Sequence, residues 1–225
     1  ILSISRDREK PFDVKIIRDS ITLDSVKIEW KSDDTLYIRL SRFAETTNNE
    51  WDSAINRATV ERPNFKNIIL DLRQNPGGYL NSAVYVASDF IKGTAVIEKF
   101  YDGTEKKINT AKSGSFEKPL LSGKKLVILV DGGSASASEI LAGTLKEKAN
   151  AYLIGEKTFG KGTVQEPIDY SDGSGLNVTI AKWLTPNKFS VNKVGLTPDK
   201  TVVMNEEDYN EKRDPQLDAA IDYLQ

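Results

Sequence analysis

Two residue types on which many enzymes depend are missing from this sequence of 225 residues. It contains no cysteine and no histidine. Without cysteine the chain has no disulfide, no thiol nucleophile and no cysteine-ligated metal or iron–sulfur cluster. Without histidine it cannot use a Ser-His-Asp triad, and almost every kind of catalytic zinc site is excluded as well. Any acyl-transfer chemistry must therefore use a lysine, an aspartate, a glutamate or an amine as its base.

Long hydrophobic runs and a strong net charge are absent too. No segment approaches the roughly 18 consecutive apolar residues of a membrane span, and no signal peptide is visible. Lysine and arginine number 31 against 33 aspartates and glutamates, so the formal net charge is −2. This balance lacks the excess of positive charge that is typical of proteins that bind nucleic acid or an anionic membrane. No motif implies a metal or a cofactor.

What is present centres on residues 125–145, KLVILVDGGSASASEILAGTL. Leu126–Val130 form a continuous apolar run typical of a strand buried on both faces. Two glycines break this run, and we expect a helix to begin in the serine-rich segment that follows. Ser136 stands three residues before Glu139, the spacing of a capping box, and Ser134 is a second candidate cap. Such serines are more often caps than nucleophiles, although free N–H groups at the turn also suit an oxyanion.

A second stretch, residues 155–165 (GEKTFGKGTVQ), follows the apolar run Ala151–Ile154. Lys161 lies between two glycines, which let the backbone pass close to another segment and carry the side chain inward. An exposed loop charge is the ordinary interpretation, and the GxxxxGK[ST] pattern of a phosphate loop is absent. The remaining interpretation is a general base for a serine. That role requires a neutral amine, so we expect burial beside Phe159 to lower the pKa of Lys161.

The rest of the chain alternates strand and helix patterns. We expect two short strands around a polar turn at residues 6–10 within residues 1–19. Residues 20–29 are transitional, with Val26, Ile28 and Trp30 alternating. Further strands are expected at residues 35–40, 67–72, 96–101, 125–130, 151–154 and 175–184, and helices at 45–60, 79–92 and 215–224. Residues 103–123 are polar and rich in lysine, which predicts a surface loop. Alternating elements with buried-type strands predict an α/β fold whose sheet is mostly parallel or mixed, with flanking helices.

The predicted strand 67–72 runs into residues 73–78, RQNPGG, and repeats the order strand, glycine turn, helix. Gly77 and Gly78 can present bare N–H groups as half of an oxyanion hole, or can simply form a tight turn. Asp71 and Arg73 can brace this turn as an ion pair or remain a solvated pair. Both glycine turns and the Lys161 loop follow strands, so we expect all three at one edge of the sheet.

Together the motifs DLRQNPGG, GGSASASEILAGTL and GEKTFGKGTVQ resemble those of peptidase family S41, the carboxyl-terminal processing or tail-specific proteases. Their order and spacing fit that family from about residue 21 to the end. The resemblance implies a serine endopeptidase with a core of the crotonase and Clp-protease type. It implies that Ser136 is the nucleophile, that Lys161 is its base and that Gln165 assists the lysine. The oxyanion hole would pair the N–H of Ala137 with that of Gly77 or Gly78.

Some of these roles have plainer alternatives. Four residues of a straight strand span about 13 Å, so Gln165 reaches Lys161 only if the chain bends, and otherwise it is a surface amide. Ser134 and Ser138 are interpreted as cap or packing residues. Among the three serines, only the resemblance selects Ser136 as the nucleophile.

The resemblance also implies a domain organisation and a setting. Residues 1–20 resemble the closing strands of a PDZ domain, which usually precedes the protease core, and residues 21–225 would be that core. Because Ile1 is not a start methionine, we expect an upstream segment. The implied substrates are proteins or peptides with apolar C-terminal tails, and a homo-oligomer or an activating partner remains open. The implied location is outside the cytoplasm, in the bacterial periplasm or envelope or in the thylakoid lumen.

Three other functions compete with an active protease. A non-catalytic binding domain on the same fold would not need both Ser136 and Lys161, which are present. A crotonase-like acyl-CoA enzyme would need a nucleotide pocket. A latent protease, which waits for its PDZ domain or an activating partner, fits the same residues and stays open.

Overall fold

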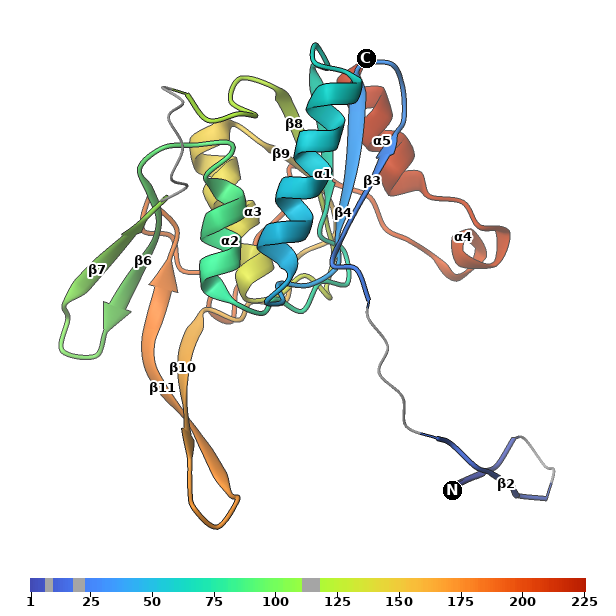
Figure 1. The fold of residues 1–225 in the computed structure, drawn as a ribbon, viewed down its shortest axis with the longest axis vertical. Helices are drawn as coiled ribbons and strands as arrows, with labels where there is room; N and C mark the ends of the chain where they lie inside the picture. Colours follow the sequence, from blue (N-terminus) through green and yellow to red (C-terminus); the bar gives the residue numbers. More distant parts are fainter. Residues whose placement is uncertain (7–9, 18–22, 111–117) are drawn as a thin grey trace.

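A six-stranded sheet forms the centre of the computed structural model, which describes residues 1–6, 10–17, 23–110 and 118–225 (Figure 1). In spatial order its strands are β12 (Lys200–Thr201), β9 (Tyr152–Gly155), β8 (Lys125–Val130), β5 (Asn67–Asp71), β4 (Thr35–Leu40) and β3 (Val26–Trp30). Neighbouring strands run parallel except β3, which pairs antiparallel with β4. The predicted mixed sheet of an α/β fold is therefore confirmed.

Helices cover both faces of this sheet, as predicted. The helices α1 (Thr47–Glu61), α2 (Leu80–Ala87) and α3 (Ala137–Ala149) pack on one face, and α5 (Pro215–Leu224) packs on the other. Strand β5 shows the reason. Ile68 and Leu70 belong to the core under α1–α3, whereas Ile69 belongs to the smaller core under α5. Successive strand residues point to opposite faces, so an all-apolar strand requires a helix layer on each side.

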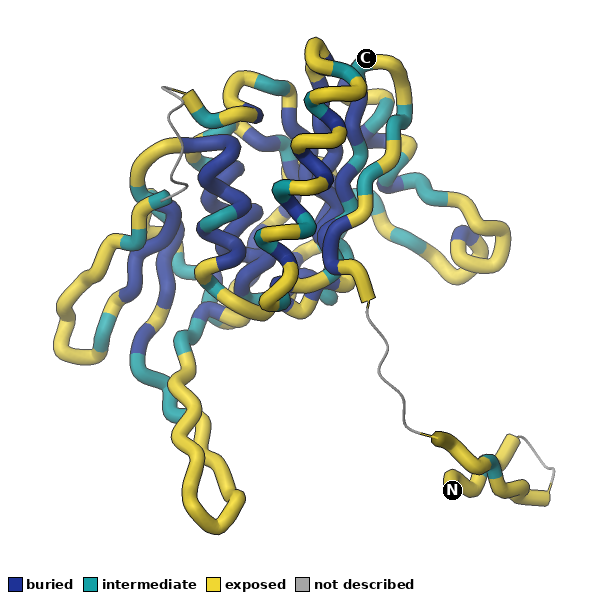
Figure 2. The backbone as a smooth tube through the Cα atoms, viewed as in Figure 1, coloured by how far each residue is buried: buried dark blue, intermediate teal, exposed yellow. Residues whose placement is uncertain are grey.

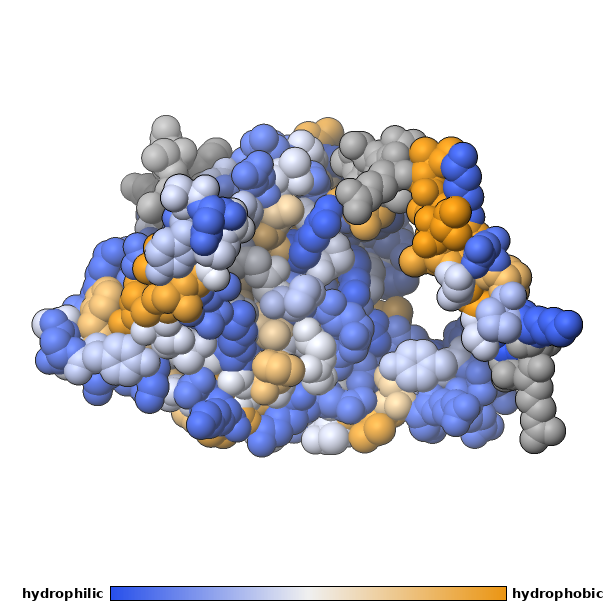
Figure 3. All heavy atoms as spheres, turned by 90° about the horizontal axis from the view of Figure 1, so that it is seen from below, coloured by the Kyte–Doolittle hydropathy of each residue, from blue (hydrophilic) through white to orange (hydrophobic). Residues whose placement is uncertain are grey.

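A second, four-stranded antiparallel sheet lies beside α2 and α3 (Figure 1). Its strands in spatial order are β10 (Thr163–Asp169), β11 (Gly175–Leu184), β6 (Thr94–Phe100) and β7 (Glu105–Asn109). The hairpin of β10 and β11 projects away from the main sheet, and its far end is exposed (Figure 2). Seen from below, the molecule is mostly hydrophilic, with hydrophobic atoms gathered towards its two sides, one of them the side of this second sheet (Figure 3). Among the described residues no helix combines the length and apolar character that a membrane span needs.

The elements that were not predicted are short, polar or exposed. The loop predicted at residues 103–123 is wrong over β7, an edge strand with three charged residues and no buried side chain. Strand β10 carries Pro167 and has no buried residue either. Strand β12 has two residues, and α4 (Glu206–Glu211) has six. Patterns of alternating burial are absent from such segments, so hydrophobic periodicity could not find them.

One predicted helix is too long. The helix expected at 79–92 is α2, which ends at Ala87 because the following residues close into tight turns. The Ser88 hydroxyl donates to the Val84 carbonyl at 2.8 Å, and the Asp89 carbonyl accepts the Leu121 N–H at 2.7 Å. The Leu121 bond occupies a carbonyl that a continued helix would have used, and the Asp89 N–H donates only three residues back, to the Val86 carbonyl at 3.2 Å.

The N-terminal part contains the two short strands that were predicted. Strands β1 (Leu2–Ile4) and β2 (Phe12–Val14) form an antiparallel pair of their own. The turn predicted at residues 6–10 lies partly outside the described residues, and the expected domain boundary between residues 20 and 21 lies wholly outside them.

The three motifs of the sequence meet at one edge of the main sheet. Strands β5, β8 and β9 are parallel neighbours, so their carboxyl ends lie side by side. The glycine turn at residues 73–78 follows β5, the serine-rich turn follows β8 and the Lys161 loop follows β9. This convergence was predicted and is confirmed.

Gly155, at the end of β9, tests how tightly this edge is built. Its φ is +127°, and a Cβ there would lie 2.1 Å from the carbonyl oxygen of Val130. We expect Gly155→Ala to lower the free energy of unfolding by about 3 kcal/mol or more, because backbone strain and a clash add. Gly93→Ala is the matched control, since Gly93 also has a positive φ (+102°) but open space around it. It should cost about 1–2 kcal/mol in urea unfolding, and equal losses in both variants would contradict the clash.

Candidate active site

The three serines of the SASAS segment lie in different environments. Ser134 and Ser138 are fully buried. Ser134 Oγ donates to the Leu72 carbonyl at 2.8 Å, and Ser138 Oγ donates to the Asn75 carbonyl at 2.9 Å. Ser136, by contrast, is partly exposed. The prediction that Ser134 and Ser138 are packing residues is confirmed, and Ser136 is the hydroxyl of the three that a substrate can reach.

Ser136 stands on a strained strand-to-helix turn. Its φ of +55° and ψ of −115° lie outside the regions that residues with side chains normally occupy. Ser136 is the N-cap of α3 and forms the predicted capping box with Glu139. A non-glycine residue held at positive φ between a buried strand and a helix is the geometry that presents a nucleophile in many hydrolases.

A single buried carboxylate joins the serine turn to the lysine loop. Glu139 is fully buried, and its Oε2 accepts the N–H groups of Ser136 at 3.0 Å and of Lys161 at 2.9 Å. Its Oε1 accepts the Thr158 hydroxyl at 2.5 Å and the Gly160 N–H at 2.7 Å. All four donors are neutral, so hydrogen bonds and the N-terminus of α3 hold the charge. Because one oxygen binds both N–H groups, the Ser136 and Lys161 backbones must lie close together.

The glycines around Lys161 let its loop pack against residues 191–195. A Cβ on Gly160 would lie 3.0 Å from a backbone nitrogen of that segment, and a Cβ on Gly162 would lie 2.6 Å from another. The Lys161 carbonyl accepts the Trp183 indole N–H at 2.9 Å. The predicted close approach of this backbone to another segment is therefore confirmed.

The predicted burial of the Lys161 side chain is wrong. Lys161 is exposed, and Phe159, which was expected to cover it, is 65% exposed. The contacts that fix this loop are made by its backbone, which leaves the lysine side chain in solvent. Among the described residues no hydrogen bond joins Lys161 Nζ to Ser136 Oγ. The structure thus brings the two backbones together but not the two reactive atoms.

Asn75 ties the glycine turn after β5 to the serine turn. Its side chain is fully buried; Nδ2 donates to the Leu40 carbonyl at 2.8 Å, and Oδ1 accepts the Gly77 N–H at 2.9 Å. Its carbonyl accepts the Ala135 N–H at 3.0 Å as well as the Ser138 hydroxyl. The two turns are therefore one hydrogen-bonded unit.

Two backbone N–H groups beside Ser136 remain available. Gly77 donates to Asn75, but no hydrogen bond of the described residues uses the N–H of Gly78 or of Ala137. Ala137 begins α3, where N–H groups lack intrahelical acceptors. A Cβ on Gly77 would lie 2.8 Å from the Ser136 Cβ. The absence of a side chain at Gly77 is thus what lets this turn lie directly against the serine.

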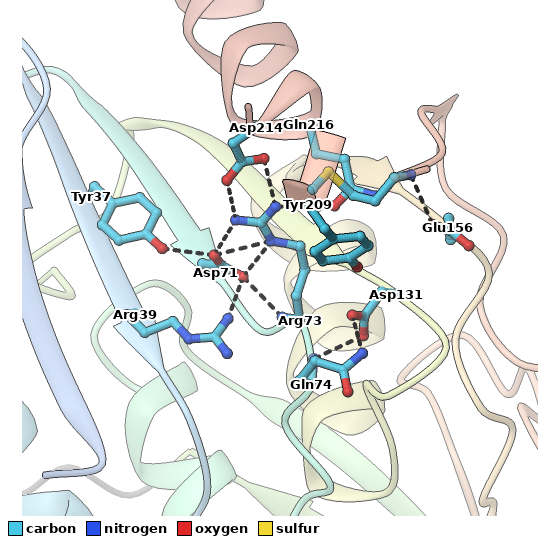
Figure 4. Close-up of a pocket in the computed structure, with 11 residues that line it drawn as sticks. Tyr37, Arg39, Asp71, Arg73, Gln74, Asp131, Glu156, Tyr209, Asp214 and Gln216 are labelled. Carbon is cyan, nitrogen blue, oxygen red and sulfur yellow. Dashed lines mark hydrogen bonds and ion pairs between the residues drawn. The ribbon is translucent and has the colours of Figure 1, made fainter. Parts of the chain in front are cut away.

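A network of charged residues braces the glycine turn from behind (Figure 4). Asp71 is 1% exposed and accepts bonds from the Arg73 N–H and guanidinium, from Arg39 at 2.7 Å and from the Tyr37 hydroxyl at 2.7 Å. Burial, with the nearby carboxylate as a second cause, raises the pKa of Tyr37 well above its usual value. Arg73 also bonds Asp214 at the start of α5, at 2.7 and 2.9 Å. The interpretation of Asp71 and Arg73 as a bracing ion pair is confirmed.

This network lines a polar pocket of about 330 Å³ at the same edge of the sheet (Figure 4). The pocket also includes Gln74 and Asp131, which link the two turns. Gln74 donates its N–H to Asp131 Oδ1 at 2.8 Å and its side-chain amide to Oδ2 at 2.6 Å. Ser136 is not among the residues that line it. The pocket therefore lies on the α5 side of the glycine turn and the serine turn, whereas Ser136 lies at the start of α3.

Gln165 lies apart from these contacts. It is exposed on β10, beside a bulge in the pairing with β11, and no hydrogen bond of the described residues joins it to Lys161. Its role as an assistant to the lysine stays a prediction.

Sequence reasoning missed three residues that organise the site. Glu139 was recognised only as a capping residue, although a lone carboxylate inside an otherwise apolar helix start is a signal for a buried acceptor. Asn75 was part of a motif without a role of its own. Asp214 lies 141 positions from Arg73, and no local pattern connects residues so far apart.

Comparison with known proteins identifies the family of this chain. The family model described as Peptidase family S41 matches residues 34–202, a range that contains the serine turn, the lysine loop and the glycine turn. The chain belongs to peptidase family S41. The resemblance drawn from the three motifs is thereby confirmed.

Curated S41 relatives are similar over most of this chain. It is 39% identical over 198 residues to the carboxy-terminal processing protease CtpA of Bacillus subtilis (strain 168), which covers 88% of this chain and 41% of the relative. It is 36% identical over 217 residues to the carboxyl-terminal-processing protease of Picosynechococcus sp. (strain ATCC 27264 / PCC 7002 / PR-6), covering 94% and 51%. The chain thus spans about half the length of the curated relatives it matches.

Solved structures confirm the fold. The photosystem II D1 C-terminal processing protease aligns with a TM-score of 0.71 and 30% sequence identity, over 82% of this chain and 50% of that one. The tricorn protease aligns with a TM-score of 0.58 and 20% identity, over 85% and 17% of the two chains, a likeness of fold alone. The expected S41-type α/β core is therefore confirmed.

Removal of the Glu139 carboxylate should destabilise the chain strongly. Glu139→Ala leaves three N–H groups and the Thr158 hydroxyl without their acceptor. Each bond to a charged group is worth about 1.5–3 kcal/mol, so we expect a loss of about 3 kcal/mol or more in urea unfolding. The control Glu166→Ala, at an exposed position of β10, should change stability by about 0.5 kcal/mol or less. A Glu139→Ala variant as stable as this control would contradict the assigned contacts.

The Arg73–Asp214 pair should make the stability depend on pH. Burial raises the pKa of Asp214, but the hydrogen bonds from Arg73 and from the Leu217 N–H outweigh it and hold this pKa below its usual range. A group with a lowered folded-state pKa stabilises above its unfolded value, about 3.9, and this contribution is lost as pH falls through the folded value.

Asp214→Asn keeps a good N-cap residue and removes the charge. It should cost about 1 kcal/mol at pH 7, and thermal unfolding should show the gap from wild type closing below about pH 4. Asp218→Asn, exposed in the same helix, is the matched control and should show a smaller gap. A gap for Asp214→Asn that is constant down to pH 2 would contradict the assigned ion pair.

Proposed function

We propose that this chain is a serine endopeptidase that uses Ser136 and Lys161 as a catalytic dyad. The observation that carries the proposal is the placement of Ser136. It is the accessible serine of three, strained on a strand-to-helix turn, and Glu139 holds its backbone next to that of Lys161. With no histidine in the chain, a lysine on the adjoining loop is the base that the fold offers to this hydroxyl.

The proposed reaction has two acyl-transfer steps. The neutral Lys161 amine removes the Ser136 proton while Oγ attacks the scissile carbonyl, and the resulting ammonium gives that proton to the leaving amine as the C–N bond breaks. A water molecule, deprotonated by the same lysine, then hydrolyses the acyl-serine ester. The oxyanion would be bound by the free N–H groups of Ala137 and Gly78. Gly77 is less suited because its N–H already bonds Asn75.

The exposed lysine side chain must be covered before it can act. Water favours the charged ammonium form, whereas contact with an apolar substrate excludes water and disfavours that form. A polypeptide lying over the Lys161 loop would bring the amine towards Ser136 and would exclude water from the amine. Gln165, on the strand that follows, would assist by hydrogen bonding to the amine once that strand contacts substrate.

The names of the relatives support the class of substrate, whereas the proposed location and domain organisation rest on the resemblance of the three motifs. The relatives' names as C-terminal processing proteases support cleavage of proteins or peptides at or near C-terminal tails. We propose from the resemblance of the motifs that these tails are apolar. We further propose residues 1–20 as the remnant of a PDZ domain and 21–225 as the protease core. The β1–β2 pair, which has a sheet of its own, is consistent with that division. The resemblance of the motifs also leads us to propose a location outside the cytoplasm, and it leaves a homo-oligomer open.

Cleavage of an unfolded protein with an apolar C-terminus tests the dyad. Ser136→Ala and Lys161→Ala should each lower kcat/KM at least about 1,000-fold, because nucleophile and base act as one unit. Lys161→Arg should fail equally, since a guanidinium does not deprotonate.

Two neighbours serve as controls for this experiment. Lys157→Ala removes an exposed lysine from the same loop, and Ser138→Ala removes a buried hydroxyl from the same turn; both should retain most activity. Activity that survives in Ser136→Ala would overturn the assignment of the nucleophile. The exposure of Lys161 favours one second candidate, a latent protease, which predicts no cleavage by this chain and cleavage once the upstream segment or an activating partner is restored.

A further inference from the structure

Strand β10 leaves one side of its backbone unpaired next to the candidate active site. It is the edge strand of the second sheet, where β11 is its neighbour. It starts at Thr163, two residues after Lys161, and runs into the projecting hairpin (Figure 1). All of its residues are exposed or only partly buried, as the yellow and teal tube in Figure 2 shows. A free strand edge is a template for another extended chain.

Hydrogen bonds at both ends of β10 establish which residues face outward. The Trp183 N–H donates to the Gly162 carbonyl at 3.1 Å, and the Tyr170 N–H donates to the Ser174 carbonyl at 2.8 Å. Gly162 and Tyr170 therefore face β11. Because backbone groups alternate in direction along a strand, the even-numbered residues between them also face β11. The odd-numbered residues point their N–H and C=O groups to the open side.

The outward residues are Thr163, Gln165, Pro167 and Asp169. The pairing is irregular between Val164, which pairs with Ala181, and Gln165, which pairs with Thr179. The extra residue lies on β11, so the alternation along β10 is unchanged. Outside the pairing of β10 with β11, no hydrogen bond of the described residues uses the backbone N–H or C=O groups of these four positions. The open edge is therefore chemically unsatisfied by the protein itself.

Pro167 interrupts this edge between Gln165 and Asp169. Proline has no N–H, and at an outward position it removes a donor from the free edge without disturbing the pairing with β11. Thr163 and Gln165 keep both a donor and an acceptor. These complete positions lie on the side nearest Lys161, and the missing donor at Pro167 separates them from Asp169 further along the hairpin.

We propose that the open edge of β10 at Thr163 and Gln165 binds the substrate polypeptide as an added β-strand. This proposal rests on the proposed function and names how its substrate is held. An extended strand rises about 3.3 Å per residue, so a chain paired with these positions lies within a few residues of the Lys161 backbone and of Ser136. The bonds go to the peptide backbone, so they fit extended polypeptides of varied sequence and reject folded ones. Gln165 then acts through its backbone, whatever its side chain does.

The first test uses the inactive variant Ser136→Ala and a fluorescein-labelled unstructured peptide with an apolar C-terminus. Binding is followed by fluorescence anisotropy while single peptide nitrogens are methylated one after another. Strand pairing predicts that methylation at alternate residues over part of the peptide weakens binding about tenfold, the loss of about one hydrogen bond with its steric cost. Losses without alternation, or no binding at all, would overturn the proposal.

A second test changes the protein edge. Added to Ser136→Ala, Gln165→Pro removes one outward N–H and should weaken peptide binding about tenfold. Asp169→Pro makes the same change at an outward position beyond Pro167 and should leave binding within about twofold of Ser136→Ala. Thermal unfolding checks that both variants keep the β10–β11 hairpin. Equal effects of the two prolines would contradict the proposal.

Two further readouts distinguish substrate pairing at β10 from self-association of the chain and from an inactive dyad. Sedimentation of Ser136→Ala tests whether a second copy of this chain occupies the open edge of β10. If Gln165→Pro abolishes a dimer and leaves peptide binding unchanged, the assignment of this edge to substrate is overturned. Turnover of a nitrophenyl ester of an acetylated amino acid, too short to pair with β10, reports on Ser136 and Lys161 alone. Failure of that turnover in the wild type counts against the proposed protease, whereas the methylation pattern decides the strand-pairing proposal by itself.

Discussion

The arrangement of this site depends on one buried carboxylate. Glu139 accepts the backbone N–H groups of Ser136 and Lys161 on a single oxygen, and Thr158 and Gly160 on the other. A buried charge without such donors would be strongly unfavourable, so folding and correct placement of the two loops are the same event. Glu139 binds the backbone N–H of Lys161, while the lysine side chain is exposed. A fixed backbone and an exposed side chain are consistent with the proposed base, from which substrate must exclude water before it reacts.

Much of the fold could be predicted because buried strands and helices have characteristic spacings of apolar residues in the sequence. The runs Lys125–Val130 and Gly175–Leu184 were placed to the residue, and so was the last helix, Pro215–Leu224. Segments with no buried face were not predicted, above all β7 and β10. These segments are strands because they pair with neighbouring strands, and their own side chains carry no pattern of burial. The end of α2 was not predicted either, because a local turn at Ser88 competes with a pattern that could have continued as helix.

The site was predictable as a set of motifs but not as a geometry. Strand order brings three turns to one edge, and that followed from the alternation of elements. The burial of Lys161 was predicted wrongly because glycines flanking a residue show that the backbone packs closely and do not show which way the side chain points. The choice between Ser134, Ser136 and Ser138 needed the depth of each hydroxyl, which depends on carbonyl groups 62 and 63 positions away in the chain.

Covalent labelling with a serine-reactive fluorophosphonate tests the central claim most directly. If Ser136 is a nucleophile activated by the lysine that Glu139 holds beside it, mass spectrometry of the digested chain should find one label, on Ser136. Its rate of formation should fall at least about 100-fold in Lys161→Ala, in keeping with the loss of a general base. Label on Ser134 or Ser138, or an unchanged rate in Lys161→Ala, would contradict the assignment of Ser136 and Lys161 as nucleophile and base.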